Sequence, residues 1–264
     1  MELETGKEIA GLIKQTPQIL TTIYSDAAQP SVRKVGQALE TVFEFSTSIL
    51  LPVKLLNEKF KLNFERNLNN YKKKIEEIPD DKICDVNPQI GTPILEKLTY
   101  TTNEEIADLF TSLLSKASNI DTLNQAHPSF IQLIERLSVD EARLIKFLNG
   151  KDFIPSISIK ANIKGGNGFE ILFRNATLLQ FQVNLVFPQN INTYLDNLTC
   201  LGILDISHGF HKLDKMLYQP IADKYNVQQL DSQYKLKGYE NVEFDKCFYQ
   251  ITDYGKQFIS AIQK

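Results

Sequence analysis

The residues with the clearest chemical potential lie close together, in the segment HPSFIQLIERLSVDEARLIKFL at residues 127–148. His127 could act as a general base toward the hydroxyl of Ser129, and Asp140 and Glu141 could form a carboxylate pair. Residues two apart at a helix start are poorly placed for proton transfer, and nucleophilic catalysis also needs an orienting third group and an oxyanion pocket. We therefore interpret His127 and Ser129 as residues that fix a helix start. The catalytic residues of any activity remain unknown, with His127, Ser129 and Glu141 as the candidates.

Two further patterns carry the residue types of binding sites without the required spacing. The segment KGGNG at residues 164–168 has the glycines of a phosphate loop, but it lacks the order G-x-x-x-x-G-K-[ST] and a following helix. His208 and His211 could offer two imidazoles to a metal ion, yet no third ligand accompanies them at a diagnostic spacing. We predict a hairpin turn and a polar loop at these two places, and no metal or cofactor.

The composition is that of an ordinary globular protein. The 264 residues are 42% hydrophobic and 23% charged, with a formal net charge of −3. A slightly negative net charge gives no sign of the basic surface that nucleic-acid binding requires. Cys84, Cys200 and Cys247 are too widely spaced for a zinc site or a disulfide framework, which favours reduced thiols in the cytosol.

No segment has the length of a membrane span. The uncharged stretch at residues 45–53 holds only nine residues between Glu44 and Lys54, whereas a spanning helix needs about 20. The N-terminal residues are amphipathic and lack the apolar core of a signal peptide. We expect a cytoplasmic protein, with contact at a membrane surface as an alternative.

Residues 32–78 carry apolar side chains at steps of three or four, which is one long helical stripe. A straight helix over this range would be roughly 70 Å long. Pro52 removes a backbone hydrogen bond, so we expect two helices that meet near it. The stripe could be core, an oligomer seam or a membrane-facing surface, and the sequence leaves this open.

Capping signals mark the other helices of the first 150 residues. The segments TNEE at 102–105 and SVDE at 138–141 both match a capping box, and Pro128 suits the first turn of a helix. Proline and glycine at residues 87–93 predict a linker. The helices expected around these signals cover two segments within 6–28, then 94–98, 106–117, 127–137 and 139–148.

The pattern changes to a mixture of strands and helices after Gly150. Short β-branched or aromatic runs flank the glycine cluster, and residues 178–187 alternate until Pro188 stops them. Gly202 follows a helix at 190–201, in the position that glycine favours after a helix. The other strands are expected at 203–206 and 248–251, and a last helix extends through Ile262. The range 212–246 is expected to hold a helical insertion.

These expectations define an α+β protein, with a helical domain at residues 1–150 and an α+β domain at 151–264. The C-terminal order of helix, strand, wing and helix resembles a winged-helix unit. In members that read DNA, the helix before the wing carries basic or amide side chains. The corresponding helix at 190–201 has no lysine or arginine, and Asp196 would repel phosphate. We therefore expect a module for packing or protein contact and no nucleic-acid partner.

Several motifs in the same order along the chain resemble the abortive-infection alpha family of bacterial proteins. The strongest resemblance is HPSF at 127–130, followed by residues 132–142. The other matching segments are YSDAAQP at 24–30, LLPVKLL at 50–56, residues 91–100, FTSLL at 110–114 and ITDYGKQF at 251–258. The resemblance is weakest at residues 151–187 and 212–246.

The resemblance implies a role in phage resistance, in which an infected cell stops supporting virus replication. It supplies no catalytic residues to transfer. Our leading hypothesis is an intracellular antiphage protein that acts through protein–protein interaction, as a homo-oligomer and with a phage component among its candidate partners. The alternatives are an enzyme with a site near His127 and a membrane-acting toxin.

Overall fold

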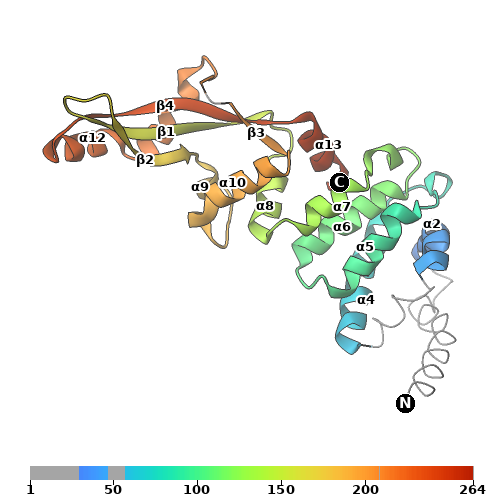
Figure 1. Ribbon diagram of the computed structural model, residues 1–264. Coiled ribbons are helices and arrows are strands. Elements are labelled where there is room, and N and C mark those ends of the chain that lie inside the picture. Colours follow the sequence, from blue (N-terminus) through green and yellow to red (C-terminus); the bar gives the residue numbers. More distant parts are fainter. Residues whose placement is uncertain (1–29, 47–56, 208, 264) are drawn as a thin grey trace. The chain divides into compact units, whose positions relative to one another are not determined.

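The structure is a computed structural model that describes residues 30–46, 57–207 and 209–263 (Figure 1). Its described residues form two compact units. The first, called here the helical unit, extends to Val139 and includes the residues from Ser260 onward, and the second, called the sheet unit, is Asp140–Ile259. The predicted domain division after residue 150 stays a prediction, because compactness alone does not define a folding domain. The helices expected within residues 6–28 and the kink at Pro52 lie outside the described residues.

Helices and short 3-10 turns build the helical unit. They are α2 (Pro30–Ser46), α4 (Glu58–Glu76), η1 (Asp80–Lys82), α5 (Pro88–Tyr100), α6 (Glu104–Ala117), η2 (Leu123–Gln125) and α7 (Ser129–Glu135). Helix α4 packs against α2, α5 and α6. Its side chains Phe64, Leu68, Tyr71 and Ile75 are completely buried. The part of the predicted apolar stripe that lies on α4 is therefore core.

Asparagine side chains cap three of these helices. Asn57, Asn87 and Asn103 each accept a hydrogen bond from a backbone N–H in the first turn of the helix that follows. The cap of α6 is thus Asn103, and the prediction that the box begins at Thr102 was wrong. The carboxamide oxygen of Asn103 lies 3.0 Å from the Ile106 nitrogen, so the helix begins at Glu104, one residue later than a cap at Thr102 would place its start.

The linker predicted at residues 87–93 was also wrong, because α5 runs through it. Pro88 occupies the first turn, where a missing N–H is tolerated, and Pro93 lies inside the helix. Gly91 explains why the helix is retained there. A Cβ atom at this position would lie 2.4 Å from a methyl group of Val42, so glycine permits close contact between α5 and α2.

The sheet unit contains a four-stranded antiparallel sheet in the order β2-β1-β4-β3. The strands are β1 (Phe153–Ile163), β2 (Phe169–Ala176), β3 (Leu204–Ser207) and β4 (Tyr239–Ile251). Figure 1 shows β1 and β4 side by side as the long central pair. Residues 164–168 form the exposed turn between β1 and β2, so the hairpin prediction is confirmed.

Helices accompany the sheet along the chain. They are α8 (Val139–Phe147), α9 (Leu179–Gln182), η3 (Pro188–Asn190), α10 (Ile191–Cys200), η4 (Lys215–Leu217), α11 (Gln219–Lys224), α12 (Val227–Leu236) and α13 (Asp253–Ala261). The expected helical insertion is confirmed by α11 and α12. The alternating stretch at 178–187 forms no strand but contains α9 and a loop. The side chain of Thr177 accepts a hydrogen bond from the Leu179 nitrogen, which favours a helical turn at that point.

The two faces of the sheet differ in what covers them. On one face, Ile157, Ile159 and Ala161 pack in a core cluster with Tyr218 and Ile221 from the segment that contains α11 and α12. On the opposite face, alternate residues near one end of β1 and β4, such as Ser156 and Cys247, are buried. Nearer the β1–β2 turn, the corresponding residues of β1 and β4 on this second face are polar and at least partly exposed, and the neighbouring residues of β2 are exposed and apolar. We call this region the open sheet face; it comprises Ser158, Lys160, Asn162, Phe169, Ile171, Asn241, Glu243 and Asp245.

The overall α+β class with a helical N-terminal part is confirmed. The C-terminal order is α10, β3, β4 and α13, and Gly202 at φ +73° follows α10 as expected. The nitrogen of Ile203 donates to the Leu198 oxygen, which closes the turn that ends the helix. This order does not by itself define a winged helix, so that comparison stays a prediction.

Candidate functional site

The candidate pair His127 and Ser129 lies at the start of α7. The Nδ1 atom of His127 is 2.7 Å from the Ser129 hydroxyl and accepts a hydrogen bond from the Ser129 backbone nitrogen at 3.2 Å. The histidine is exposed, and its ring packs on Phe130 with 5.7 Å between ring centroids. One imidazole nitrogen thus satisfies the backbone N–H of Ser129, the first residue of α7, although Pro128, which precedes the helix, forms no side-chain cap. It supports the interpretation that His127 fixes the helix start.

The candidate Glu141 is buried at the start of α8, where its carboxylate accepts a hydrogen bond from the Asn197 side chain at 2.7 Å. Its neighbour Asp140 is also buried. The Asp140 carboxylate accepts hydrogen bonds from the nitrogens of Val186 and Phe187, at 2.6 and 2.8 Å, and from the Tyr194 hydroxyl at 2.8 Å. Both acidic residues therefore attach α8 to elements of the sheet unit far along the chain.

Hydrogen bonding also sets the protonation state of Asp140. Burial by itself raises the pKa of this carboxyl, but the two backbone N–H donors and the Tyr194 hydroxyl outweigh burial, so the pKa lies below its usual value. The group is a carboxylate at neutral pH, and its oxygens already accept three hydrogen bonds. This arrangement is that of a structural anchor.

Metal binding has no support in the described part of the chain. No group of three or more His, Cys, Asp or Glu side chains lies close enough there to hold a metal ion. Of the two histidines considered from the sequence, His208 lies outside the described residues, and the ring of His211 faces Tyr218 at 6.5 Å.

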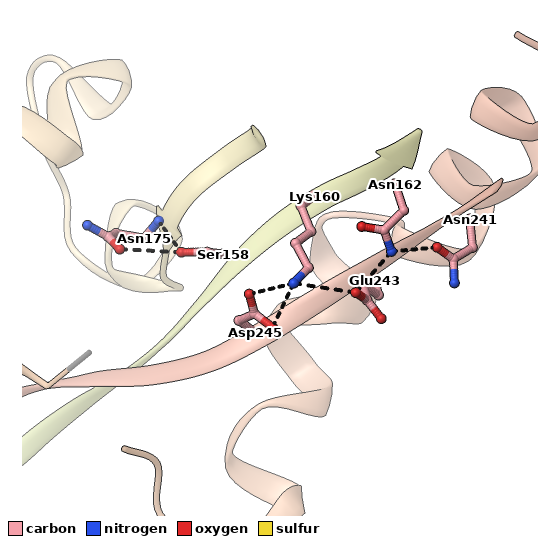
Figure 2. Close-up of polar contacts among 7 residues, drawn as sticks. All are labelled: Ser158, Lys160, Asn162, Asn175, Asn241, Glu243 and Asp245. Atoms are coloured by element: carbon pink, nitrogen blue, oxygen red, sulfur yellow. Dashed lines mark hydrogen bonds and ion pairs between the residues drawn. The ribbon is translucent and has the colours of Figure 1, made fainter. Parts of the chain in front are cut away.

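The polar network of the open sheet face is a second candidate, and sequence reasoning missed it (Figure 2). Lys160 donates to both carboxylate oxygens of Asp245, at 3.2 and 2.9 Å, and forms an ion pair with Glu243 at 3.4 Å. Asn162 donates to Glu243 at 3.0 Å and to Asn241 at 2.7 Å. The network links β1 to β4 through residues that lie opposite each other in the sheet.

The local sequence contains the signal for this network. Polar residues alternate with apolar ones in SISIKANI on β1 and in NVEFDK on β4, and the antiparallel register pairs Ser158 with Asp245 and Lys160 with Glu243. Alternation of this kind is typical of a strand with one face in the core and one face open. The pairing of two segments about 80 residues apart could not be read from the alternation.

Mutual attraction changes the protonation equilibria of the network. The hydrogen bond from Lys160 to Asp245 raises the pKa of the lysine, and the hydrogen bond from Asn162 lowers the pKa of Glu243. Each group therefore holds its charge more firmly at neutral pH. Groups stabilised in this way are poor proton donors or acceptors for a reaction, so the network favours recognition over acid–base catalysis.

Apolar side chains border the network on the edge strand β2. Phe169 and Ile171 are each 55% exposed, and the Lys160 ammonium lies 5.3 Å from the centre of the Phe169 ring. Exposed aromatic and aliphatic side chains beside neutralised charges are typical of protein contact surfaces. The open sheet face therefore combines exposed apolar side chains with a paired set of charged groups.

The motif residues near the C-terminus act within the fold. Thr252 donates from its hydroxyl to the Gly202 oxygen at 2.6 Å and accepts from the Gly255 nitrogen at 2.8 Å. A Cβ atom on Gly255 would lie 2.3 Å from the Ile203 oxygen, so only glycine fits there. The segment I-T-x-x-G thus attaches α13 to the start of β3.

The described residues form an α+β protein with a helical unit and an antiparallel sheet unit. Comparison with known families places it further: the model of the family described as abortive infection alpha matches residues 63–262. The match spans most of the chain, so the chain belongs to the abortive infection alpha family.

Other comparisons add little to the family assignment. No curated protein matches the chain. A solved structure of an uncharacterized protein from the hydrocarbon-degrading marine bacterium Alcanivorax borkumensis SK2 is 16% identical, with a TM-score of 0.33. That similarity covers 51% of this chain and 92% of the other. Among the described residues, no helix combines the length and apolar character needed to cross a membrane.

Proposed function

We propose that this protein acts in phage defence by abortive infection and does so through contact with other proteins. The observation that carries the proposal is membership of the abortive infection alpha family over residues 63–262. The side chains of Asp140, Glu141 and Lys160 already form hydrogen bonds within the fold. This supports a role in protein contact over a role in catalysis.

The partner that pairs beside the open sheet face, at its edge strand β2, is in this proposal a second copy of the chain. Strand β2 lies at the edge of the sheet, and the backbone groups on the outer side of an edge strand are free to pair with another strand. Antiparallel pairing of two β2 strands about a two-fold axis is self-complementary, because each copy offers the same residues. The exposed Phe169 and Ile171 would then lie beside the same residues of the second copy on one face of the extended sheet.

Phage plating and culture survival test the defence role. Cells that express the chain are infected at low and at high multiplicity and compared with cells that carry an empty vector. Abortive infection predicts protection of the culture at low multiplicity and death of the infected cells at high multiplicity. Failure to protect against a broad phage panel would contradict the proposal, and survival at high multiplicity would indicate a defence that spares the infected cell.

A further inference from the structure

The helical unit contains a pocket of about 200 Å3 near the ends of α4 and α6. Ile78 and Pro79 supply an apolar part of its wall. Its polar lining includes Lys74, Ser112, Ser115, Lys116, Asn119 and Thr122. Three of these residues, Ser112, Ser115 and Lys116, lie at helical spacings of three and four on α6, which puts them on one face of that helix.

Ser112 is the most informative residue of the pocket. It is only 5% exposed and lines the pocket, and its hydroxyl has no hydrogen-bond partner among the described residues. Hydroxyl groups nearby behave differently. Thr111 donates to the Asp108 oxygen at 3.1 Å, and Ser118 donates to the Leu114 oxygen at 2.7 Å. The Ser112 hydroxyl is not fully enclosed, since it reaches the pocket, where solvent or a ligand can form a hydrogen bond with it.

One lysine of the pocket is available to an anion. Lys116 is half-buried and has no carboxylate within ion-pair distance in the described part of the chain, whereas Lys74 is paired with Asp108 at 2.7 Å. Glu77 also lines the pocket, so the lining has two ammonium groups against one carboxylate. Because Asp108 neutralises Lys74, Lys116 is the one ammonium of the lining without a carboxylate partner in the described part of the chain.

Hydrogen-bond donors outnumber acceptors among the polar groups that lack partners. The Asn119 side-chain oxygen accepts from the Asp121 nitrogen at 3.0 Å, which leaves its NH2 group as a donor. The Lys116 ammonium is purely a donor, and the hydroxyls of Ser112 and Ser115 can both donate. A ligand that accepts hydrogen bonds from several directions and carries negative charge would satisfy all four groups.

We propose that this pocket binds the phosphate group of a small phosphate ester. A phosphate offers several acceptor oxygens and a charge that lysine and hydroxyl donors stabilise. The volume corresponds to roughly six or seven water molecules at ~30 Å3 each, which leaves room for a short organic part beside Ile78 and Pro79. This inference is independent of the defence role, because it concerns a ligand of the helical unit.

Calorimetric titration of the full chain tests the site with glycerol 3-phosphate, inorganic phosphate, acetate and glycerol as probes. The ester is expected to bind more tightly than inorganic phosphate, and acetate and glycerol are expected to give no heat. Lys116→Gln should weaken binding of the ester roughly tenfold or more, and Ser112→Ala roughly two- to tenfold. Lys73→Gln is the matched control, because Lys73 is an exposed lysine of α4 that does not line the pocket.

Each other outcome overturns the assignment. No binding at ~10 mM probe would exclude even a weak site. Equal loss of affinity in the Lys116 and Lys73 variants would indicate general attraction to surface charge. If acetate bound as tightly as glycerol 3-phosphate, the site would be one for carboxylates. If inorganic phosphate bound and glycerol 3-phosphate did not, the pocket would not accept a phosphate ester. An unchanged affinity in Lys116→Gln would mean that this lysine only neutralises the end of α6.

Discussion

At the scale of single residues, the buried carboxylate of Asp140 accepts three hydrogen bonds, so its loss should destabilise the sheet unit. Replacing Asp140 by asparagine leaves one oxygen to accept from Val186, Phe187 and Tyr194 and adds an NH2 group beside donors. We expect a loss of about 2 kcal/mol in the free energy of unfolding. Urea denaturation at neutral pH measures it, with the exposed Asp196→Asn as control.

The same residue predicts a pH dependence. Because the folded pKa of Asp140 lies below the unfolded value of about 4, its contribution is complete above that value and is lost as the pH falls through the folded pKa. Asp140→Asn should therefore reduce the acid sensitivity of the protein below about pH 4. An identical pH profile for variant and wild type would show that other groups govern acid unfolding.

His127 distinguishes a structural role from catalysis. In the capping interpretation, His127→Ala removes the acceptor of the Ser129 N–H and lowers stability by about 1 kcal/mol, while defence persists in proportion to the folded protein. His127→Asn should restore stability, since asparagine also accepts from backbone nitrogens. Complete loss of defence in His127→Ala at an unchanged melting temperature would instead favour an enzyme.

At the scale of elements, glycine permits close packing of one element on another, as Gly255 of α13 does beside Ile203 before β3. In Gly255→Ala, the new Cβ would meet the Ile203 carbonyl oxygen, a backbone atom that cannot rotate away. We expect destabilisation by about 2 kcal/mol through displacement of α13 from β3. Thermal unfolding measures it, and Gly36→Ala is the control, because its Cβ meets nothing within 4 Å and alanine favours the helix.

At the scale of the whole molecule, the exposed apolar residues of β2 should control association. The double change Phe169→Ser and Ile171→Thr places polar groups where a second β2 strand would pack, adds no charge opposite Lys160, and leaves the buried face of the sheet unchanged. We expect light scattering to show that the wild type is a dimer and the double variant a monomer. Phage protection should be weaker in cells that express the variant. The matched control is Leu236→Lys, a change to another exposed apolar residue, on α12.

Two results would contradict the dimer. A wild-type protein that is monomeric at all accessible concentrations excludes β2 pairing. A dimeric double variant places the interface elsewhere. If the wild type is a monomer and the double variant still loses protection at full stability, the open sheet face contacts a different protein, such as a phage component.

The sequence by itself determined those features that depend on neighbouring residues. Spacing of apolar residues predicted the apolar stripe of α4 but not its burial, the glycine cluster predicted the β1–β2 turn, and Gly202 predicted the end of α10. The family also follows from motifs in their order along the chain. Local steric preferences and the period of apolar residues depend on only a few neighbouring residues, so they can be predicted from the sequence alone.

Only the tertiary structure decided which distant residues meet. Residues 87–93 carry a local helix start, Asn87 with Pro88, and the close contact of Gly91 with Val42 of α2 could not be read from them. The alternating residues 178–187 form no strand, and hydrogen bonds to Thr177 and Asp140 hold them in another conformation. The network of Lys160 with Asp245 likewise joins residues far apart in the chain. The pocket that Ser112 lines is also formed by distant segments. Packing and pairing free energies exceed local preferences, and they depend on a register that no short segment contains.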